Sequence, residues 1–454
     1  MLIAFLCALC LDTIDYRPYL RAPYYSKTMA RLRANAATNR INRGFVEAGF
    51  GSARLTPILN SATNVPLEGK FRTLPLAGYG NRHGRPATGV HDDLYVKAVA
   101  IRVGSEMVVM FGADALIVPR EVADVAVERL RADLGLRREQ LYFSATHTHS
   151  SLGGWGPGWV GEAFAGNFNS GVPLWFADRF VAAAKKAVED LRPAEFGHGS
   201  FSAREFVRNR VVGELGSVDP EFSYAVFKQL NGRLGVLGSY NAHATVLSGA
   251  VMEFSADYPG YWQRAIESAT GGAAVFLAGS VGSHGPVPGD KGYEGAKRMG
   301  EALAAALLKR LPEIALTNQI AFGVLGLEVS LPPLNPRITD GIRLRPWLAA
   351  QLLPANRDSF LQVVRLGNSL WVSTPCDFSG ELALDIKNLV RVRNFSVSIT
   401  SFNGDYIGYV IPGRYYHLDG YEPRTMSFYG PNVPAYLDGL IRTMALDFVD
   451  APSN

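Results

Sequence analysis

The chain has 454 residues, of which 48% are hydrophobic and 19% are charged, so it can bury a large core and is typical of a globular protein. Its 45 basic and 41 acidic residues give a formal net charge of +4, and no long basic run with interleaved aromatic residues is present. This argues against nucleic acid as a partner. With only Cys7, Cys10 and Cys376, the chain has neither a disulfide framework nor a thiolate zinc cluster, so any metal must be held by nitrogen and oxygen.

Residues 1–44 are expected to form an N-terminal segment and arm. The apolar run 1–11 has the length of a signal-peptide core but lacks a preceding Lys or Arg, and it is shorter than the roughly 20 apolar residues that span a bilayer. A weak export signal, an anchor and a remnant of start-site choice all remain open. Residues 12–35 mix tyrosine with arginine, which suits peripheral membrane contact and equally suits an arm docked on the protein. An exported or membrane-associated protein is favoured over a cytoplasmic one.

From about residue 45 apolar strands alternate with amphipathic helices. Residues 96–104 and 106–116 predict two strands joined by a tight turn, and 119–135 predicts a helix with Pro119 near its start and Gly135 at its end. A strand over 140–150 and a helix over 172–192 follow. This order predicts a crossover unit in a sheet covered by helices.

The second half continues the pattern. The expected elements are two strands around Asn231-Gly232, a buried strand running into a glycine-rich loop at 273–286, a helix at 291–312, a hairpin around Gly367-Asn368 followed by a helix, a strand with a polar loop at 396–416, and a helix at 431–448. No linker or internal repeat divides them. We therefore predict an α/β fold with a mixed sheet flanked by helices, in a single large catalytic domain over residues 45–454.

Two histidines stand at the end of the strand predicted in QLYFSATHTHSSLGG, residues 140–154. In an extended segment side chains alternate, so His147 and His149 are expected on one face. Two imidazoles on one face suit a metal ion, a carboxylate or an anionic substrate as a shared partner. Two solvated histidines at a strand end are the alternative.

Three further polar features stand at strand ends. His91 precedes a strand, Asp377 lies between a strand and a helix, and Tyr406 and Tyr409 follow a third strand. Each alone has an ordinary explanation: a structural histidine, a helix N-cap and core packing. Together, histidines and a carboxylate could hold a catalytic zinc with an open position, which lowers the pKa of water to roughly 7 and suits cleavage of an amide or ester.

Six short motifs occur along the chain: Gly-x-His at 89–91, SATHTHS and its glycines at 144–154, PCDFS at 375–379, GYV at 408–410, Tyr421-Glu422, and YGP at 429–431. Together and in this order they resemble the catalytic N-terminal domain of the neutral/alkaline (non-lysosomal) ceramidase family, over roughly residues 45–450, as a divergent member.

The resemblance implies a zinc-dependent amidohydrolase of sphingolipid metabolism that cleaves the N-acyl bond of a lipid such as ceramide with metal-activated water. His147 would polarise the substrate carbonyl, and Tyr421 would hydrogen-bond near the reacting amide. The implied zinc ligands are His91, His149, Asp377 in place of the family glutamate, and Tyr409.

Other residues carry open alternatives. Asp114 could support a ligand or act as a general base, or simply form a turn. His243 and Asp257 resemble family positions that line the site, with core roles equally open. Cys376 lacks a visible activating base, and His284 in its glycine-rich loop is expected to be exposed.

Several departures from the family pattern keep other functions open. Asn209-Arg210-Val211-Val212 stands where the family has Asn-Arg-Ser-Pro, so a serine nucleophile is excluded there. The loop 279–286 is only loosely similar, and the C-terminal β-sandwich of many ceramidases is not expected. A catalytically altered lipid-binding protein and a hydrolase of a different amide or ester are the alternatives. A two-metal phosphatase or phosphodiesterase would usually bring more aspartate ligands.

Overall fold

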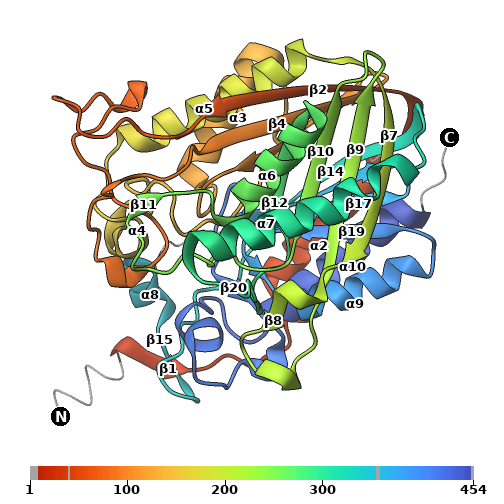
Figure 1. Ribbon diagram of the computed structural model, residues 1–454. Helices are drawn as coiled ribbons and strands as arrows, with labels where there is room; N and C mark the ends of the chain where they lie inside the picture. The colour runs from red at the N-terminus through yellow and green to blue at the C-terminus, as the bar shows by residue number, and fades with distance from the viewer. Residues whose placement is uncertain (1–8, 39–40, 354–357, 451–454) are drawn as a thin grey trace.

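A twelve-stranded mixed sheet forms the centre of the computed structural model, which describes residues 9–38, 41–353 and 358–450 (Figure 1). The main path runs β12 (Ala273–Ala278), β10 (Leu234–Tyr240), β9 (Glu221–Gln229), β7 (Arg192–Ser202), β2 (Asn42–Arg54), β14 (Gln319–Ser330), β16 (Asp358–Leu366), β17 (Ser369–Ser373), β19 (Ser396–Thr400). A branch from β2 continues through β4 (Tyr95–Val103), β5 (Glu106–Ala113) and β6 (Leu141–Tyr142). Parallel pairs join β10 to β12, β5 to β6 and β17 to β19, so the predicted mixed α/β class is confirmed.

Strand β2 is the branch point of the sheet. Its residues 46–48 pair with β7, 46–54 with β4, and 42–45 with β14. Gly49 and Gly51 lie against α5 (Gly171–Glu189): a Cβ at either position would come within 2.2 Å of a backbone oxygen of that helix. The glycines of β2 therefore let α5 rest directly on the sheet.

Helices cover the sheet in three groups (Figure 1). Helix α3 (Arg120–Leu134) packs with α5 over β4 and β5, and α6 (Asp257–Thr270) packs with α7 (Gly292–Leu308) over β10 and β12. Helices α2 (Pro23–Thr38), α9 (Gly380–Arg391) and α10 (Val433–Asp450) cover β14, β16 and β17. A further apolar cluster is shared among strands of both halves of the sheet, including Phe50, Met110, Leu237 and Trp371. Each such buried side chain contributes about 1.5–3 kcal/mol, which fixes the sheet and hence the loops at its edge.

Most of the predicted elements are confirmed. The turns at Gly104, Gly232 and Gly367 all have positive φ, as tight hairpins require, and α3, α5, α7, α9 and α10 overlap the predicted helices. Helix α3 starts after Pro119, ends at the left-handed Gly135, and buries Val122, Ala126 and Leu130 at i, i+4 spacing.

One predicted strand is wrong in extent. Residues 140–150 contain only the two-residue β6, after which the chain follows β5 through single hydrogen bonds and then turns at His147, whose φ is 64°. The turn comes directly after Thr146, whose amide donates to the Ala113 oxygen where β5 ends. Elements that periodicity did not reveal include α6, α4 (Gly158–Ala165) and α8 (Pro346–Leu352).

Three short strand pairs lie outside the sheet and position the loops of the site. They are β3 (Gly89–Val90) with β11 (Glu253–Phe254), β8 (Val207–Asn209) with β13 (His284–Pro286), and β18 (Asp377–Phe378) with β20 (Tyr409–Val410). The last pair sets Asp377 directly beside Tyr409 in register.

The N-terminal arm docks on the protein. Residues 1–8 of the apolar run predicted as a signal or anchor lie outside the described residues. Strand β1 (Leu11–Thr13), which follows this segment, pairs with β15 (Ile342–Leu344). Helix α2 buries Leu32 against the β14 side of the molecule, and Thr28 accepts a hydrogen bond from Tyr436. The predicted boundary between residues 44 and 45 falls inside β2. Across the described ranges, no helix is both long and apolar enough to cross a membrane.

Candidate metal centre

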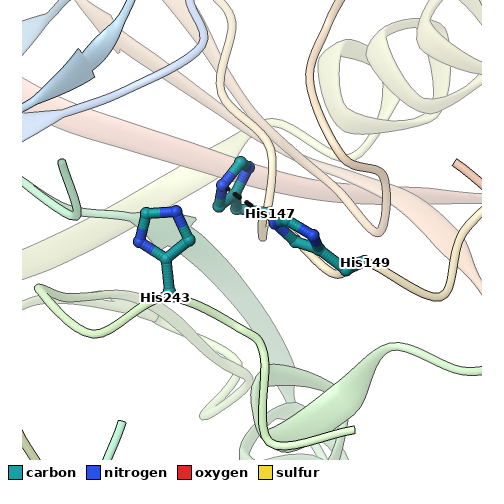
Figure 2. Close-up of side chains that lie close together, drawn as sticks. All are labelled: His147, His149 and His243. Atoms are coloured by element: carbon teal, nitrogen blue, oxygen red, sulfur yellow. Dashed lines mark hydrogen bonds between the residues drawn. The ribbon is translucent and has the colours of Figure 1, made fainter. Parts of the chain in front are cut away.

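Three imidazoles meet beyond the ends of two strands. His147 and His149 follow β6, His243 follows β10, and one ring nitrogen from each lies within 4.8 Å of those of the other two. Figure 2 shows the rings side by side, with the His147–His149 hydrogen bond dashed. The three histidines are compatible with a metal site.

Backbone geometry differs from the extended segment that the sequence predicts. His147 adopts positive φ and stacks on Phe402, whose ring centroid lies 4.2 Å away and whose own φ is 69°. Such strained conformations in non-glycine residues persist only where surrounding contacts hold them, and they concentrate at functional sites. On the other side, Gly78 has φ +115°, and a Cβ there would lie 2.7 Å from the His149 Cβ. The loop therefore needs glycine where it passes His149.

Backbone carbonyls fix the tautomers of two histidines. His147 Nδ1 lies 2.7 Å from the Leu116 oxygen, and His243 Nδ1 lies 2.8 Å from the Val281 oxygen. Carbonyls only accept, so both Nδ1 atoms carry the proton and both Nε2 atoms present lone pairs.

Those lone pairs face a carboxylate. Asp377 Oδ1 lies 3.4 Å from Nε2 of His147 and 3.4 Å from Nε2 of His243. Tyr406 donates a 2.7 Å hydrogen bond to Oδ2, whereas Oδ1 is fully buried and accepts no hydrogen bond from the described residues. Two acceptor nitrogens facing an unsatisfied carboxylate oxygen repel it, and either protonation of the carboxyl or a cation bound between these atoms relieves the repulsion.

Tyr409 supplies a further oxygen. Its hydroxyl lies 3.1 Å from His243 Nε2 and accepts a 2.9 Å hydrogen bond from Arg210. Arg210 in turn forms a 3.0 Å ion pair with Glu422. Burial, and then the neighbouring Asp377, raise the pKa of Tyr409 well above its usual value, and Arg210 opposes that shift. The phenol is therefore neutral without a bound cation, which would favour its ionised, metal-binding form.

Burial dominates the electrostatics. It raises the pKa of Asp377 to about 7 and lowers the pKa of His147 to about 3. The pKa of His243 is also lowered well below its usual value, first by burial and then by Arg210. A divalent cation supplies the charge that this buried set lacks. Two imidazole nitrogens, a carboxylate and a phenol oxygen are donors that zinc accepts, so the described residues fit a divalent metal.

His91, predicted as a zinc ligand, is not part of this cluster. Its side chain is exposed, its Nε2 lies 3.0 Å from the Tyr261 hydroxyl, and its ring stacks on Tyr293 with centroids 3.5 Å apart. The pairing of β3 with β11 carries it to that position. The imidazole that faces Asp377 together with His147 belongs to His243 instead.

Asp114, predicted as a supporting or basic carboxylate, also lies apart from the histidines. Both oxygens are satisfied, because Oδ2 accepts from the Tyr95 amide and Oδ1 from Gln263, each at 2.9 Å. This carboxylate ties β4 to α6.

A cavity of about 420 Å³ opens on the cluster. His147, His149, Asp377, Tyr409 and the predicted Tyr421 all line it. Most of its remaining wall is apolar: Leu116, Ile117, Trp155, Val160, Phe164, Leu352, Leu353, Met426 and Phe428. Its size and lining suit a small apolar molecule or an acyl chain.

Sequence reasoning did not assign roles to Arg210 and Tyr406, and it left His243 equally open between site and core. One available signal was position: His243 follows an apolar strand at a short interval, as His147 does. No sequence feature placed Arg210 beside Tyr409, because they are 199 residues apart.

Comparisons with known proteins agree with the fold. Residues 66–282 match the family described as neutral/alkaline non-lysosomal ceramidase, N-terminal. The fold resembles the crystal structure of neutral ceramidase from Pseudomonas aeruginosa, at 19% identity and a TM-score of 0.72, over 89% of this chain and 75% of that one. A structure titled as ceramidase complexed with C2 gives 19% identity and a TM-score of 0.73 over the same shares. No curated relative matches the sequence. The resemblance predicted from the motifs is confirmed over residues 66–282, and the two solved structures share the fold.

Proposed function

We propose that the chain is a zinc-dependent amidohydrolase that cleaves the N-acyl bond of a lipid such as ceramide, because residues 66–282 match the neutral/alkaline non-lysosomal ceramidase family. The observation that carries this proposal is the buried Asp377 Oδ1, without a hydrogen bond and 3.4 Å from two imidazole nitrogens that present lone pairs. An apolar cavity opens on the same atoms, so a lipid amide could reach them.

The proposed zinc ligands are His147, His243, Asp377 and Tyr409. When bound, zinc supplies the Lewis acidity that lowers the pKa of water to roughly 7. Asp377 is one methylene shorter than the family glutamate, and its pairing with Tyr409 through β18 and β20 supports its reach to the histidines. In the proposed set His147 is a zinc ligand and His149 is not, which reverses the roles that the resemblance implied for these two residues.

His149 is proposed to face the substrate. Its Nε2 lies 3.3 Å from His147 Nε2, and zinc would take the lone pair of His147 Nε2, so an Nε2–H on His149 would be left free for the substrate. Its pKa is lowered well below the usual value, chiefly by burial, so the ring is neutral. A neutral imidazole N–H beside the cluster is suited to donate to the acyl oxygen as negative charge develops there.

Tyr421 is proposed to hydrogen-bond the reacting amide. It lines the cavity, and its ring meets Tyr409 edge-on with centroids 5.6 Å apart. Arg210 keeps a positive charge beside Tyr409 and is proposed to hold that phenol in its ligating orientation.

Val211 offers no nucleophile where the family has serine. The amides of Val211 and Val212 both donate to Asn209 Oδ1, so the segment is held as a turn that presents Arg210. Attack by water fits this arrangement, and a covalent serine route does not.

Turnover of a fluorescent short-chain ceramide tests the proposal. We expect fatty-acid release by the zinc-loaded protein, loss of release after chelation with recovery on adding zinc, and release at least about a hundredfold slower in His149→Ala at unchanged zinc content. Hydrolysis of matched esters but not amides would change the proposed bond. Tight binding of ceramide without any turnover would contradict the enzyme and leave the lipid-binding alternative.

A further inference from the structure

Two nearly uncharged segments border the mouth of the cavity. They are residues 155–164, which include most of α4, and residues 346–353, which include α8; together we call them the mouth rim. Both contribute to the cavity wall. The only charged residue of the rim is Glu162, whose carboxylate accepts a 3.2 Å hydrogen bond from the Phe168 amide.

Large apolar side chains of the rim face solvent. Trp159 is 75% exposed, Trp347 is 57% exposed and Leu352 is 45% exposed. Figure 1 places α4 and α8 on the same side of the molecule, in agreement with their shared cavity. Exposed tryptophans in two segments that line the same cavity, with Glu162 as their one charged residue, mark an interaction surface.

We propose that the mouth rim docks on the surface of a lipid bilayer and opens the cavity directly onto it. The inference rests on the proposed function, because a two-chain lipid amide resides in a membrane and has almost no monomer in water. Tryptophan suits this partner, since its ring prefers the headgroup level, where an apolar body and a polar N–H are both accommodated.

The local chemistry favours a bilayer over a protein partner. The rim lines the cavity that His147 and His149 also line, so a protein seated on the rim would obstruct access to the proposed site. A bilayer instead delivers substrate through that entrance. Trp347 also holds the start of the arm, through a 3.3 Å hydrogen bond from its Nε1 to the Leu9 oxygen, which adds the 46% exposed Leu9 to the same surface.

This surface differs from the membrane contact that the sequence suggested for the N-terminal arm. The arm's helix α2 is packed against β14, with Leu32 buried. Only the beginning of the described arm, at β1 and Leu9, adjoins the rim.

Binding to phosphatidylcholine vesicles without substrate tests the proposal. Trp347→Ala is the main variant, since Trp347 does not line the cavity; Leu230→Ala, 73% exposed at the β9–β10 turn, is the matched control. We expect the protein to co-sediment with vesicles with a blue shift of tryptophan emission, Trp347→Ala to bind about tenfold more weakly, and Leu230→Ala to bind like the original. Trp159→Ala should weaken binding by a similar factor, so the proposal can still be tested if Trp347→Ala fails to fold.

Hydrolysis assays separate this inference from the proposed function. Trp347→Ala should raise KM for ceramide in vesicles while leaving turnover of the soluble short-chain ceramide unchanged. Equal vesicle binding by Trp347→Ala and Leu230→Ala, or a Trp347-dependent dimer in sedimentation, would overturn bilayer docking even if turnover occurs. Vesicle binding through Trp347 without turnover of any amide would instead overturn the proposed function and leave the docking surface standing.

Discussion

Two buried aspartates show what separates the candidate metal centre from the rest of the core. Asp377 is fully buried and Asp114 is 2% exposed, and burial raises the pKa of the first to about 7 and of the second to about 6. Asp114 nevertheless has donors on both oxygens, whereas Asp377 Oδ1 has none and faces two lone pairs. A raised pKa therefore does not distinguish these two carboxylates, whereas the unsatisfied oxygen of Asp377 does, and this oxygen is the reason for proposing Asp377 as the metal ligand.

The largest expected effect distinguishes Asp377 from Asp114. Asp377→Asn removes the negative charge from the ligand set, so we expect loss of bound zinc and a fall in turnover of roughly a thousandfold or more. Metal analysis and the ceramide assay measure both. Asp114→Asn is the matched control and should keep its zinc and most of its activity; equal zinc loss in both variants would contradict the distinction.

His243 and His91 offer a second contrast. His243→Ala removes an imidazole that faces Asp377, so we expect zinc affinity to fall by roughly a hundredfold or more. Competition with a fluorescent chelator measures the affinity. His91→Ala removes a ring stacked on Tyr293 and should leave affinity unchanged. A metal that depends on His91 and not on His243 would restore the ligand set predicted from the sequence.

The hydrogen bond from Tyr406 to Asp377 Oδ2 is expected to have an intermediate effect. Tyr406→Phe keeps the ring but removes the donor that orients the carboxylate, so zinc affinity or activity should fall by between about ten- and a hundredfold. Tyr142→Phe, which removes a buried hydroxyl bonded to Thr400, is the matched control. Identical zinc affinities for the two variants would show that Tyr406 only packs.

The smallest effect concerns stability at Asp114. Burial raises the pKa of Asp114 to about 6, above the usual value of an aspartate, which is about 3.9, so the fold prefers the neutral acid. This contribution is fully present below the unfolded pKa and is lost as pH rises through about 6, by up to about 3 kcal/mol. Asp114→Asn should remove that loss, so the difference in unfolding free energy between variant and original should change between pH 4 and pH 7. Urea unfolding at several pH values measures it, and a constant difference would contradict the assignment.

Local sequence signals predicted much of the fold. Alternating apolar residues and turn glycines such as Gly104 and Gly232 located the hairpins, because these signals depend on near neighbours. The same reasoning failed over residues 140–150, since the positive φ of His147 is imposed by contacts with distant residues such as Phe402. Periodicity alone could not detect that strain.

The site was predictable only in part for the same reason. Motif order drew attention to Asp377 and Tyr409, which β18 and β20 bring into register. The choice between His91 and His243 depended on which loop turns inward, and that is decided by tertiary pairing. Because β3 pairs with β11, His91 remains at the surface, while β10 delivers His243 beside Tyr409.

Anomalous X-ray scattering at the zinc edge from crystals of the zinc-loaded protein tests the central claim most directly. We predict one strong peak within bonding distance of Nε2 of His147, Nε2 of His243, Oδ1 of Asp377 and the Tyr409 hydroxyl. A peak elsewhere, or no peak between these four atoms at full zinc loading, would contradict the account.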